Sequence, residues 1–122
     1  KIGSISINRN KVTKDNLNFF DDIKNITAKT NRPLIIFPQG TRVKPEERPP
    51  FKKGAGRIYE ELKISCQPVA INSGYVWPKK GYKVPNKEIN ISILPKIESG
   101  MERDEFVKNI EEKIYSELNN FN

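Results

Sequence analysis

Cationic side chains follow the apolar segments of this sequence, where they could bind an anion. Arg42 comes shortly after the apolar run Leu34–Phe37, within the stretch FPQGTR, and Arg9 follows the alternating stretch Ile2–Asn8. An arginine guanidinium presents N–H donors in a planar fork that matches the oxygens of a phosphate or a carboxylate. Either arginine taken alone is better explained as a solvated residue at the end of a strand, so the argument depends on their neighbours.

The stretch FKKG, Phe51–Gly54, places two lysines and a glycine directly before a predicted helix. The first turn of a helix has free backbone N–H groups, which attract anions. In FPQGTR, Gly40 permits a turn conformation that other residues resist, and Pro38 cannot donate a ladder hydrogen bond. Lys52 and Lys53 are equally explained as solvated loop lysines. Together, these features suit a phosphate site at the strand ends, where α/β proteins bind ligands.

Strands and helices must alternate to bring these residues to one edge of a sheet. The hydrophobic pattern predicts strands at 2–8, 34–37, 67–71 and 88–94, and helices at 13–29, 54–62 and 102–119. The continuous apolar run 34–37 is typical of a strand covered on both faces. Residues 44–50, with three prolines and four charges, predict a surface loop. The order of elements predicts an α/β fold with a mostly parallel sheet flanked by helices.

The composition excludes several kinds of site. The chain has 122 residues, no histidine and one cysteine, Cys66. An internal disulfide, a Cys/His zinc site and a Ser-His-Asp triad cannot form from this chain alone, and we expect neither a metal nor a cofactor. No run of about 18 apolar residues is present. The net charge of +7 attracts anions, but the chain has no block of five basic residues, so we expect no nucleic-acid partner. Trp77 fits a core position or an interface anchor.

Four stretches occur in the order that characterises one enzyme family. They are GSISINR (Gly3–Arg9), FPQGTR, FKKG and QPVAINSG (Gln67–Gly74). They resemble the second to fourth conserved blocks of the bacterial 1-acyl-sn-glycerol-3-phosphate acyltransferases, whose third block reads FPEGTR. The tail from Glu88 resembles the closing strand and helix of that family, so the resemblance covers essentially the whole chain.

The resemblance implies a fold and a set of site residues. Residues 1–122 would form a single incomplete acyltransferase domain of the glycerolipid acyltransferase-like fold, truncated at its N-terminus. The residues implied in substrate binding are Gly3, Arg9, Gln39, Gly40, Thr41, Arg42 and Lys53. The residues implied in shaping the pocket are Pro38, Gly54 and Pro68. We expect Arg9, Arg42 and Lys52 or Lys53 to face one cleft.

The resemblance also implies a reaction. A fatty acyl group would pass from acyl carrier protein or coenzyme A to the sn-2 hydroxyl of 1-acylglycerol 3-phosphate, giving phosphatidic acid for phospholipid synthesis. The family's first block, His-x-x-x-x-Asp, supplies the base; we expect it upstream of Lys1, so this chain contains no catalytic residue of its own. The implied partners are lysophosphatidic acid, the acyl donor and a membrane surface, at the cytoplasmic face of a bacterial inner membrane.

Two alternatives and one departure from the family remain. The acceptor could be glycerol 3-phosphate or a lyso-ornithine lipid, or the chain could be a basic anion- or lipid-binding module without chemistry. Gln39 stands where the family has a glutamate. Glutamine keeps the acceptor oxygen but replaces the negative charge with an N–H donor.

Overall fold

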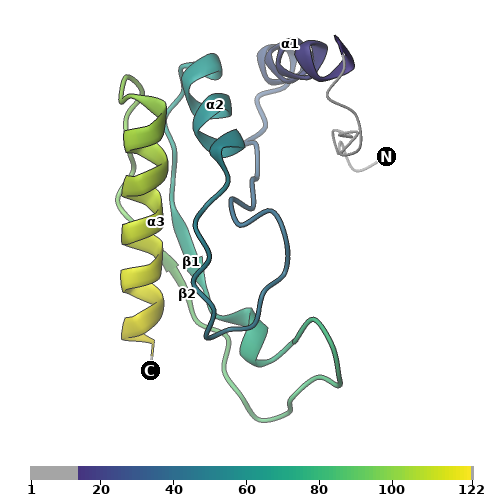
Figure 1. Ribbon diagram of the computed structural model, residues 1–122, viewed down its shortest axis with the longest axis vertical. Helices are drawn as coiled ribbons and strands as arrows, with labels where there is room; N and C mark the ends of the chain where they lie inside the picture. The colour runs from purple at the N-terminus through teal and green to yellow at the C-terminus, as the bar shows by residue number, and fades with distance from the viewer. Residues whose placement is uncertain (1–13, 122) are drawn as a thin grey trace. The chain divides into compact units, whose positions relative to one another are not determined.

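The computed structural model describes residues 14–121. The chain divides into a first unit, Lys1–Ile36, and a second unit, Phe37–Asn122 (Figure 1). The predicted strand 2–8 and the candidate residues Gly3 and Arg9 lie outside the described residues. That the chain forms a single incomplete domain stays a prediction.

The first unit contains helix α1, Lys14–Lys29. Near its C-terminal end, threonine side chains bind backbone carbonyl groups: Thr27 Oγ1 donates to the Ile23 carbonyl at 2.8 Å, and Thr30 Oγ1 donates to the Ile26 carbonyl at 2.7 Å. Such bonds compete with the helical backbone pattern, and Pro33, three residues on, cannot continue a helix. The predicted end of this helix is confirmed.

The predicted strand at 34–37 is wrong. These residues form no strand, and Ile35 is 77% exposed. A strand exists only through its ladder of hydrogen bonds to a neighbour, and within residues 14–121 no segment pairs with this one. The run of apolar residues predicted a buried strand, but it could not show whether another segment pairs with it.

Within the described residues, the sheet consists of two short strands of the second unit, β1 (Val69–Ile71) and β2 (Ile91–Ile93). They are antiparallel, and Ala70 lies opposite Ser92. The predicted strands 67–71 and 88–94 are thus confirmed in shorter form. The mostly parallel sheet is not what residues 14–121 form, because β1 is followed by the 3₁₀ turn η1 (Ser73–Tyr75) and a loop that returns the chain beside it.

The two faces of this sheet differ. On one face Ala70 is fully buried, and Ser92 Oγ donates to Glu117 Oε1 at 2.8 Å, which joins this face to the C-terminal helix α3, Arg103–Asn120. The opposite face is apolar and exposed by 42–72%; it consists of Val69, Ile71, Ile91 and Ile93. Among the described residues of the second unit, the sheet is therefore covered on its α3 side and exposed on the other.

Helix α2, Lys53–Leu62, packs against α3 over an aromatic core (Figure 1). Tyr59 of α2 and Phe106 of α3 are both buried, with ring centroids 3.8 Å apart and planes parallel. Phe51, Ile97 and Ile110 complete the cluster. The predicted helices 54–62 and 102–119 are confirmed, and Tyr59 is the most buried hydrophobic residue of α2. The lone Cys66 packs against this core, and burial raises the pKa of its thiol.

Gly56 lets the two helices approach each other closely. A Cβ at this position would lie 2.7 Å from both the Arg103 carbonyl oxygen and Val107 Cγ2. Backbone atoms of α3 therefore occupy the space that any other side chain would need.

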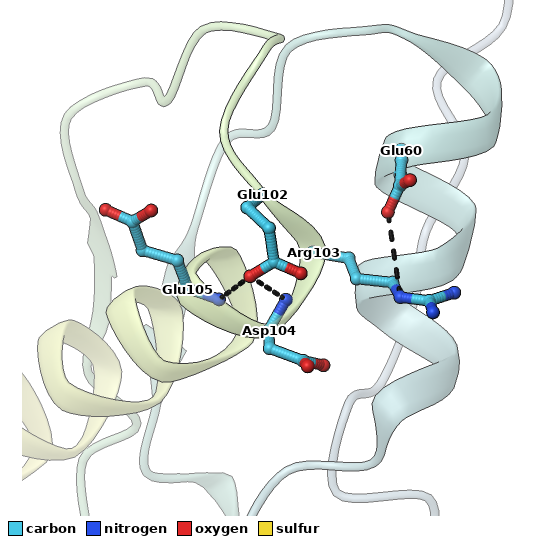
Figure 2. Close-up of polar contacts among 5 residues, drawn as sticks. All are labelled: Glu60, Glu102, Arg103, Asp104 and Glu105. Atoms are coloured by element: carbon cyan, nitrogen blue, oxygen red, sulfur yellow. Dashed lines mark hydrogen bonds and ion pairs between the residues drawn. The ribbon is translucent and has the colours of Figure 1, made fainter.

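The N-terminus of α3 is capped by the Glu102 side chain and forms an ion pair with α2. Glu102 accepts from the backbone N–H groups of Asp104 and Glu105, both at 3.0 Å, and these bonds lower the pKa of its carboxyl (Figure 2). Arg103 Nε lies 3.8 Å from Glu60 Oε2 of α2, in an exposed ion pair. Within residues 14–121, no helix combines the length and apolar character that crossing a bilayer requires.

Replacing Gly56 by alanine tests the close approach of α2 to α3. The added methyl must push α3 away, which costs about 1–3 kcal/mol, while alanine recovers about 1 kcal/mol of helix propensity. We expect the free energy of unfolding, measured in urea, to fall by about 0–2 kcal/mol, the difference between these two terms. Gly54 is the matched control in the same helix, since a Cβ there meets no atom within 4 Å. Gly54→Ala should leave stability unchanged or raise it; a loss equal to that of Gly56→Ala would contradict the packing.

Candidate anion site at the FPQGTR turn

FPQGTR forms a tight turn at the start of the second unit. The Gly40 N–H donates to the Phe37 carbonyl at 3.0 Å, which closes a four-residue turn with Pro38 and Gln39 at its centre. Proline at the second position and glycine at the fourth are the residues that such turns prefer. Gly40 has φ +74°, a conformation that L side chains rarely adopt. The glycine and the proline thus fix the path of the chain before Thr41 and Arg42.

FKKG lies directly against this turn. The Lys52 N–H donates to the Pro38 carbonyl at 2.8 Å, and a Cβ on Gly40 would lie 3.0 Å from Lys52 Cγ. The lysine stem therefore covers the glycine, and its ammonium group remains exposed. The structure thus brings FPQGTR and FKKG, which are separated by the proline-rich loop, into contact.

The remaining candidates in this region are exposed. Thr41, Arg42, Lys53 and Gly54 all face solvent. Among the described residues, the N-cap position of α2, Lys52, supplies no side-chain hydrogen bond, and the first turn contains no acid. A helix start of this kind leaves backbone donors free and favours negative charge. Because Arg9 lies outside the described residues, the cleft shared by Arg9 and Arg42 stays a prediction.

Gln39 is held by the C-terminal helix. Its Nε2 donates to the Tyr115 hydroxyl at 3.1 Å, and that hydroxyl donates to the Pro49 carbonyl. A tyrosine hydroxyl has one proton to give. Since Tyr115 donates that proton to the Pro49 carbonyl, its hydroxyl can only accept a hydrogen bond from residue 39. The amide of glutamine can donate such a bond, whereas a carboxylate cannot. The departure from the family's glutamate therefore fits the local hydrogen bonding.

Phe51 and Arg48 also contact helix α3. The Phe51 N–H donates to Glu111 Oε2 at 2.7 Å, and its ring lies edge-on to Tyr115 with centroids 5.0 Å apart. The Arg48 guanidinium lies over the Tyr115 ring, 5.4 Å from its centroid, and donates to the Pro45 carbonyl. Burial raises the pKa of the Tyr115 phenol, so its hydroxyl keeps its proton at neutral pH.

The residues on either side of β1 include the candidate Pro68. Pro68 is buried just before β1, where its carbonyl accepts from the Leu94 N–H at 3.0 Å. Its position thus supports strand pairing, and whether it also shapes a pocket stays a prediction. Beyond β1, a Cβ on Gly74 would lie 3.2 Å from Pro45 Cγ. The end of this strand therefore contacts the proline-rich loop that joins FPQGTR to FKKG.

Comparison with known sequences decides the family. The profile of the Acyltransferase family matches residues 1–72, more than half of the chain. The chain belongs to the Acyltransferase family. The resemblance of its sequence blocks to this family is thereby confirmed, and the FPQGTR turn and FKKG both lie inside the matched region.

Two curated relatives carry the same printed name. A 1-acyl-sn-glycerol-3-phosphate acyltransferase of Helicobacter pylori strain J99 is 38% identical over 98 residues, which cover 73% of this chain and 41% of the relative. One of Cocos nucifera is 27% identical over 96 residues, which cover 78% of this chain and 31% of the relative. The chain thus spans less than half the length of these relatives. No solved structure matches it significantly.

For this member of the Acyltransferase family, the sequence pattern missed the supporting residues on α3. Tyr115 and Glu111 belong to a helix whose apolar stripe predicted only core packing. The signal was present: a tyrosine and a glutamate four residues apart lie on the same face of a helix, and the polar end of a buried tyrosine needs a partner. Their partners, Pro49 and Phe51, could not be found from sequence spacing.

Gln39→Glu and Tyr115→Phe test the direction of the hydrogen bonds at the turn. A glutamate would compete with Pro49 for the one hydroxyl proton, so we expect Gln39→Glu to lower the free energy of unfolding by about 1–3 kcal/mol. Tyr115→Phe should cost about 0.5–1.5 kcal/mol. In the Tyr115→Phe background the competition is gone, so adding Gln39→Glu should cost clearly less.

The control for the tyrosine change is Tyr82→Phe, at a side chain that is almost fully exposed; it should change stability by less than about 0.5 kcal/mol. Strictly additive effects of Gln39→Glu and Tyr115→Phe would show that the two side chains do not interact.

Proposed function

We propose that the protein transfers a fatty acyl group from a thioester, acyl carrier protein or acyl-coenzyme A, to the sn-2 hydroxyl of 1-acylglycerol 3-phosphate. The product would be phosphatidic acid, in phospholipid synthesis. The observation that carries the proposal is the seating of Lys52 against the FPQGTR turn in a chain of the Acyltransferase family. Two curated relatives bear the name of this activity.

In this proposal, the described residues bind the acceptor rather than perform the proton transfer. Arg42 would take the phosphate through its planar fork of donors, and Lys52, Lys53 and the free N–H groups at the start of α2 would add positive potential. Holding the phosphate fixes the glycerol hydroxyl relative to the thioester carbonyl, which lowers the entropic part of the barrier. Gln39, held by Tyr115, would keep the turn in the shape that binding needs.

The base would come from outside these 122 residues. The chain contains no histidine, and the His-x-x-x-x-Asp block of the family would stand before its second block. There, the imidazole would take the hydroxyl proton as the oxygen attacks the thioester carbon. The C–S bond would then break, and the imidazolium would return the proton to the departing sulfur, which leaves as a thiol. In the longer protein the fold would be the glycerolipid acyltransferase-like one, acting at the cytoplasmic face of a bacterial inner membrane.

The 122-residue chain alone should not turn over lysophosphatidate. None of its side chains can act as the imidazole base, and binding without proton transfer leaves most of the barrier in place. The assay mixes the chain with lysophosphatidate and an acyl thioester and follows phosphatidic acid by mass spectrometry. Turnover well above the uncatalysed rate would show that another residue is the base.

Arg42→Ala and Lys44→Ala test the phosphate contact. The ligand is a short-chain lysophosphatidate, and calorimetry measures its binding to the chain. A charge-assisted hydrogen bond contributes about 1.5–3 kcal/mol, so Arg42→Ala should weaken binding roughly tenfold to a hundredfold. Lys44 is equally cationic and exposed, but it is the first residue of the proline-rich loop and lies outside the FPQGTR turn. Its loss should therefore change binding less than about threefold.

The matched ligand is the monoacylglycerol of the same chain length, which lacks the phosphate. With this ligand the difference between the two variants should disappear. Equal effects of both substitutions on lysophosphatidate binding, or an Arg42→Ala defect that persists without the phosphate, would assign Arg42 to the fold instead of the substrate.

A further inference from the structure

The loop between η1 and β2 exposes aromatic rings and lysines together. This aromatic–lysine loop, residues 76–87, projects from one end of the second unit (Figure 1). Trp77 is 61% exposed and Tyr82 is 96% exposed. An aromatic side chain that is mostly exposed contributes little apolar burial to the stability of the fold. Two such side chains in one loop therefore indicate a binding surface.

The charge of the loop has one sign. It carries four lysines, Lys79, Lys80, Lys83 and Lys87, all exposed, and contains no aspartate or glutamate. Lys83 Nζ lies over the Trp77 ring, 4.2 Å from its centroid. The lysine stem and the indole thus form one apolar surface with a cationic rim, in which the ammonium group can turn outward to a negative partner.

The loop is held in shape at its base. The Val84 N–H donates to the Val76 carbonyl at 2.9 Å, which closes the segment that carries Trp77 and Tyr82. Below it, the Asn90 N–H donates to Asn72 Oδ1 at 2.7 Å, between the ends of β1 and β2. The rings are therefore presented by a closed loop on a paired sheet.

We propose that the aromatic–lysine loop docks the protein on an anionic lipid bilayer. Tryptophan and tyrosine rings prefer the depth of the lipid headgroups, where an apolar body and a polar tip are both satisfied. Lysines beside them are attracted by the negative surface potential of the bilayer. The acceptor in the proposed function is itself a membrane lipid, so a bilayer is the partner that this function requires, and a soluble acidic protein is an alternative outcome of the test. The proposal extends the proposed lipid acyl transfer, but its test requires no turnover.

The chain provides its own probe for this surface. Trp77 is the only tryptophan, so tryptophan fluorescence, excited selectively over the tyrosines, reports on the loop alone. The probe partners are vesicles of neutral phosphatidylcholine and of phosphatidylcholine with phosphatidylglycerol. We expect a blue shift of the Trp77 emission, and quenching by brominated acyl chains, with the anionic vesicles. Raising the salt concentration should weaken the effect.

Two charge-reversal variants separate the loop from the net charge. Lys79→Glu with Lys80→Glu should weaken partitioning to anionic vesicles roughly tenfold or more. The control, Lys108→Glu with Lys113→Glu, changes the net charge equally at two exposed positions of α3, and should weaken it less than about threefold. Tyr82→Ala, which removes an aromatic ring without changing the charge, should also weaken partitioning. Circular dichroism confirms that each variant is folded.

Three results would overturn the proposal. Vesicle binding without a change in Trp77 emission would place the contact elsewhere, for example on the exposed face of the sheet. Equal losses in the two charge-reversal variants would show attraction by net charge only. If the loop does not bind vesicles but binds a soluble acidic protein, its partner is a protein and not a bilayer. Failure of the lysophosphatidate binding experiments would leave the vesicle results intact, so the two proposals can fail separately.

Discussion

The seating of Phe51 against α3 fixes the position of the candidate site. Its ring is buried in the core cluster beside Tyr115, and its N–H is bound by Glu111. The next residue, Lys52, then donates its own N–H to the Pro38 carbonyl. Because Phe51 is anchored in the hydrophobic core, the adjacent Lys52 has a fixed position against the exposed cationic turn. The turn itself has little apolar packing.

This arrangement explains why the turn is held by hydrogen bonds of fixed direction. A partly exposed turn gains little from apolar burial, so polar contacts must define it. Tyr115 supplies such a contact because it accepts from Gln39 and donates to Pro49. Each group has one role, and exchange of a donor for an acceptor at position 39 breaks the sequence of bonds. The glutamine is therefore constrained by its neighbours as much as by any ligand.

How far the sequence predicts this structure depends on whether the deciding contact is local. Helix α3 was predicted well because Phe106 and Ile110 recur with the helical period, and the end of α1 was predicted from the residues around Pro33. The run 34–37 failed because a strand depends on a distant partner that its own residues do not specify. The anion-binding chemistry of FPQGTR and FKKG predicted only that their cations face one cleft, which stays a prediction. Tyr115 was missed, because its role depends on a contact across 76 residues of sequence.

Helix α3 also supports both of the exposed surfaces for which we propose a ligand. It holds the turn through Tyr115 and Glu111, and it holds the sheet through Glu117 and Ser92. The aromatic–lysine loop leaves β1 through η1 and returns into β2, so its two ends are fixed by the pairing of Val69 with Ile93 and of Ile71 with Ile91. The turn and the loop therefore belong to one packed unit. A lipid surface that bound the loop would set the orientation of that unit, and with it the direction in which Arg42 meets a lipid headgroup.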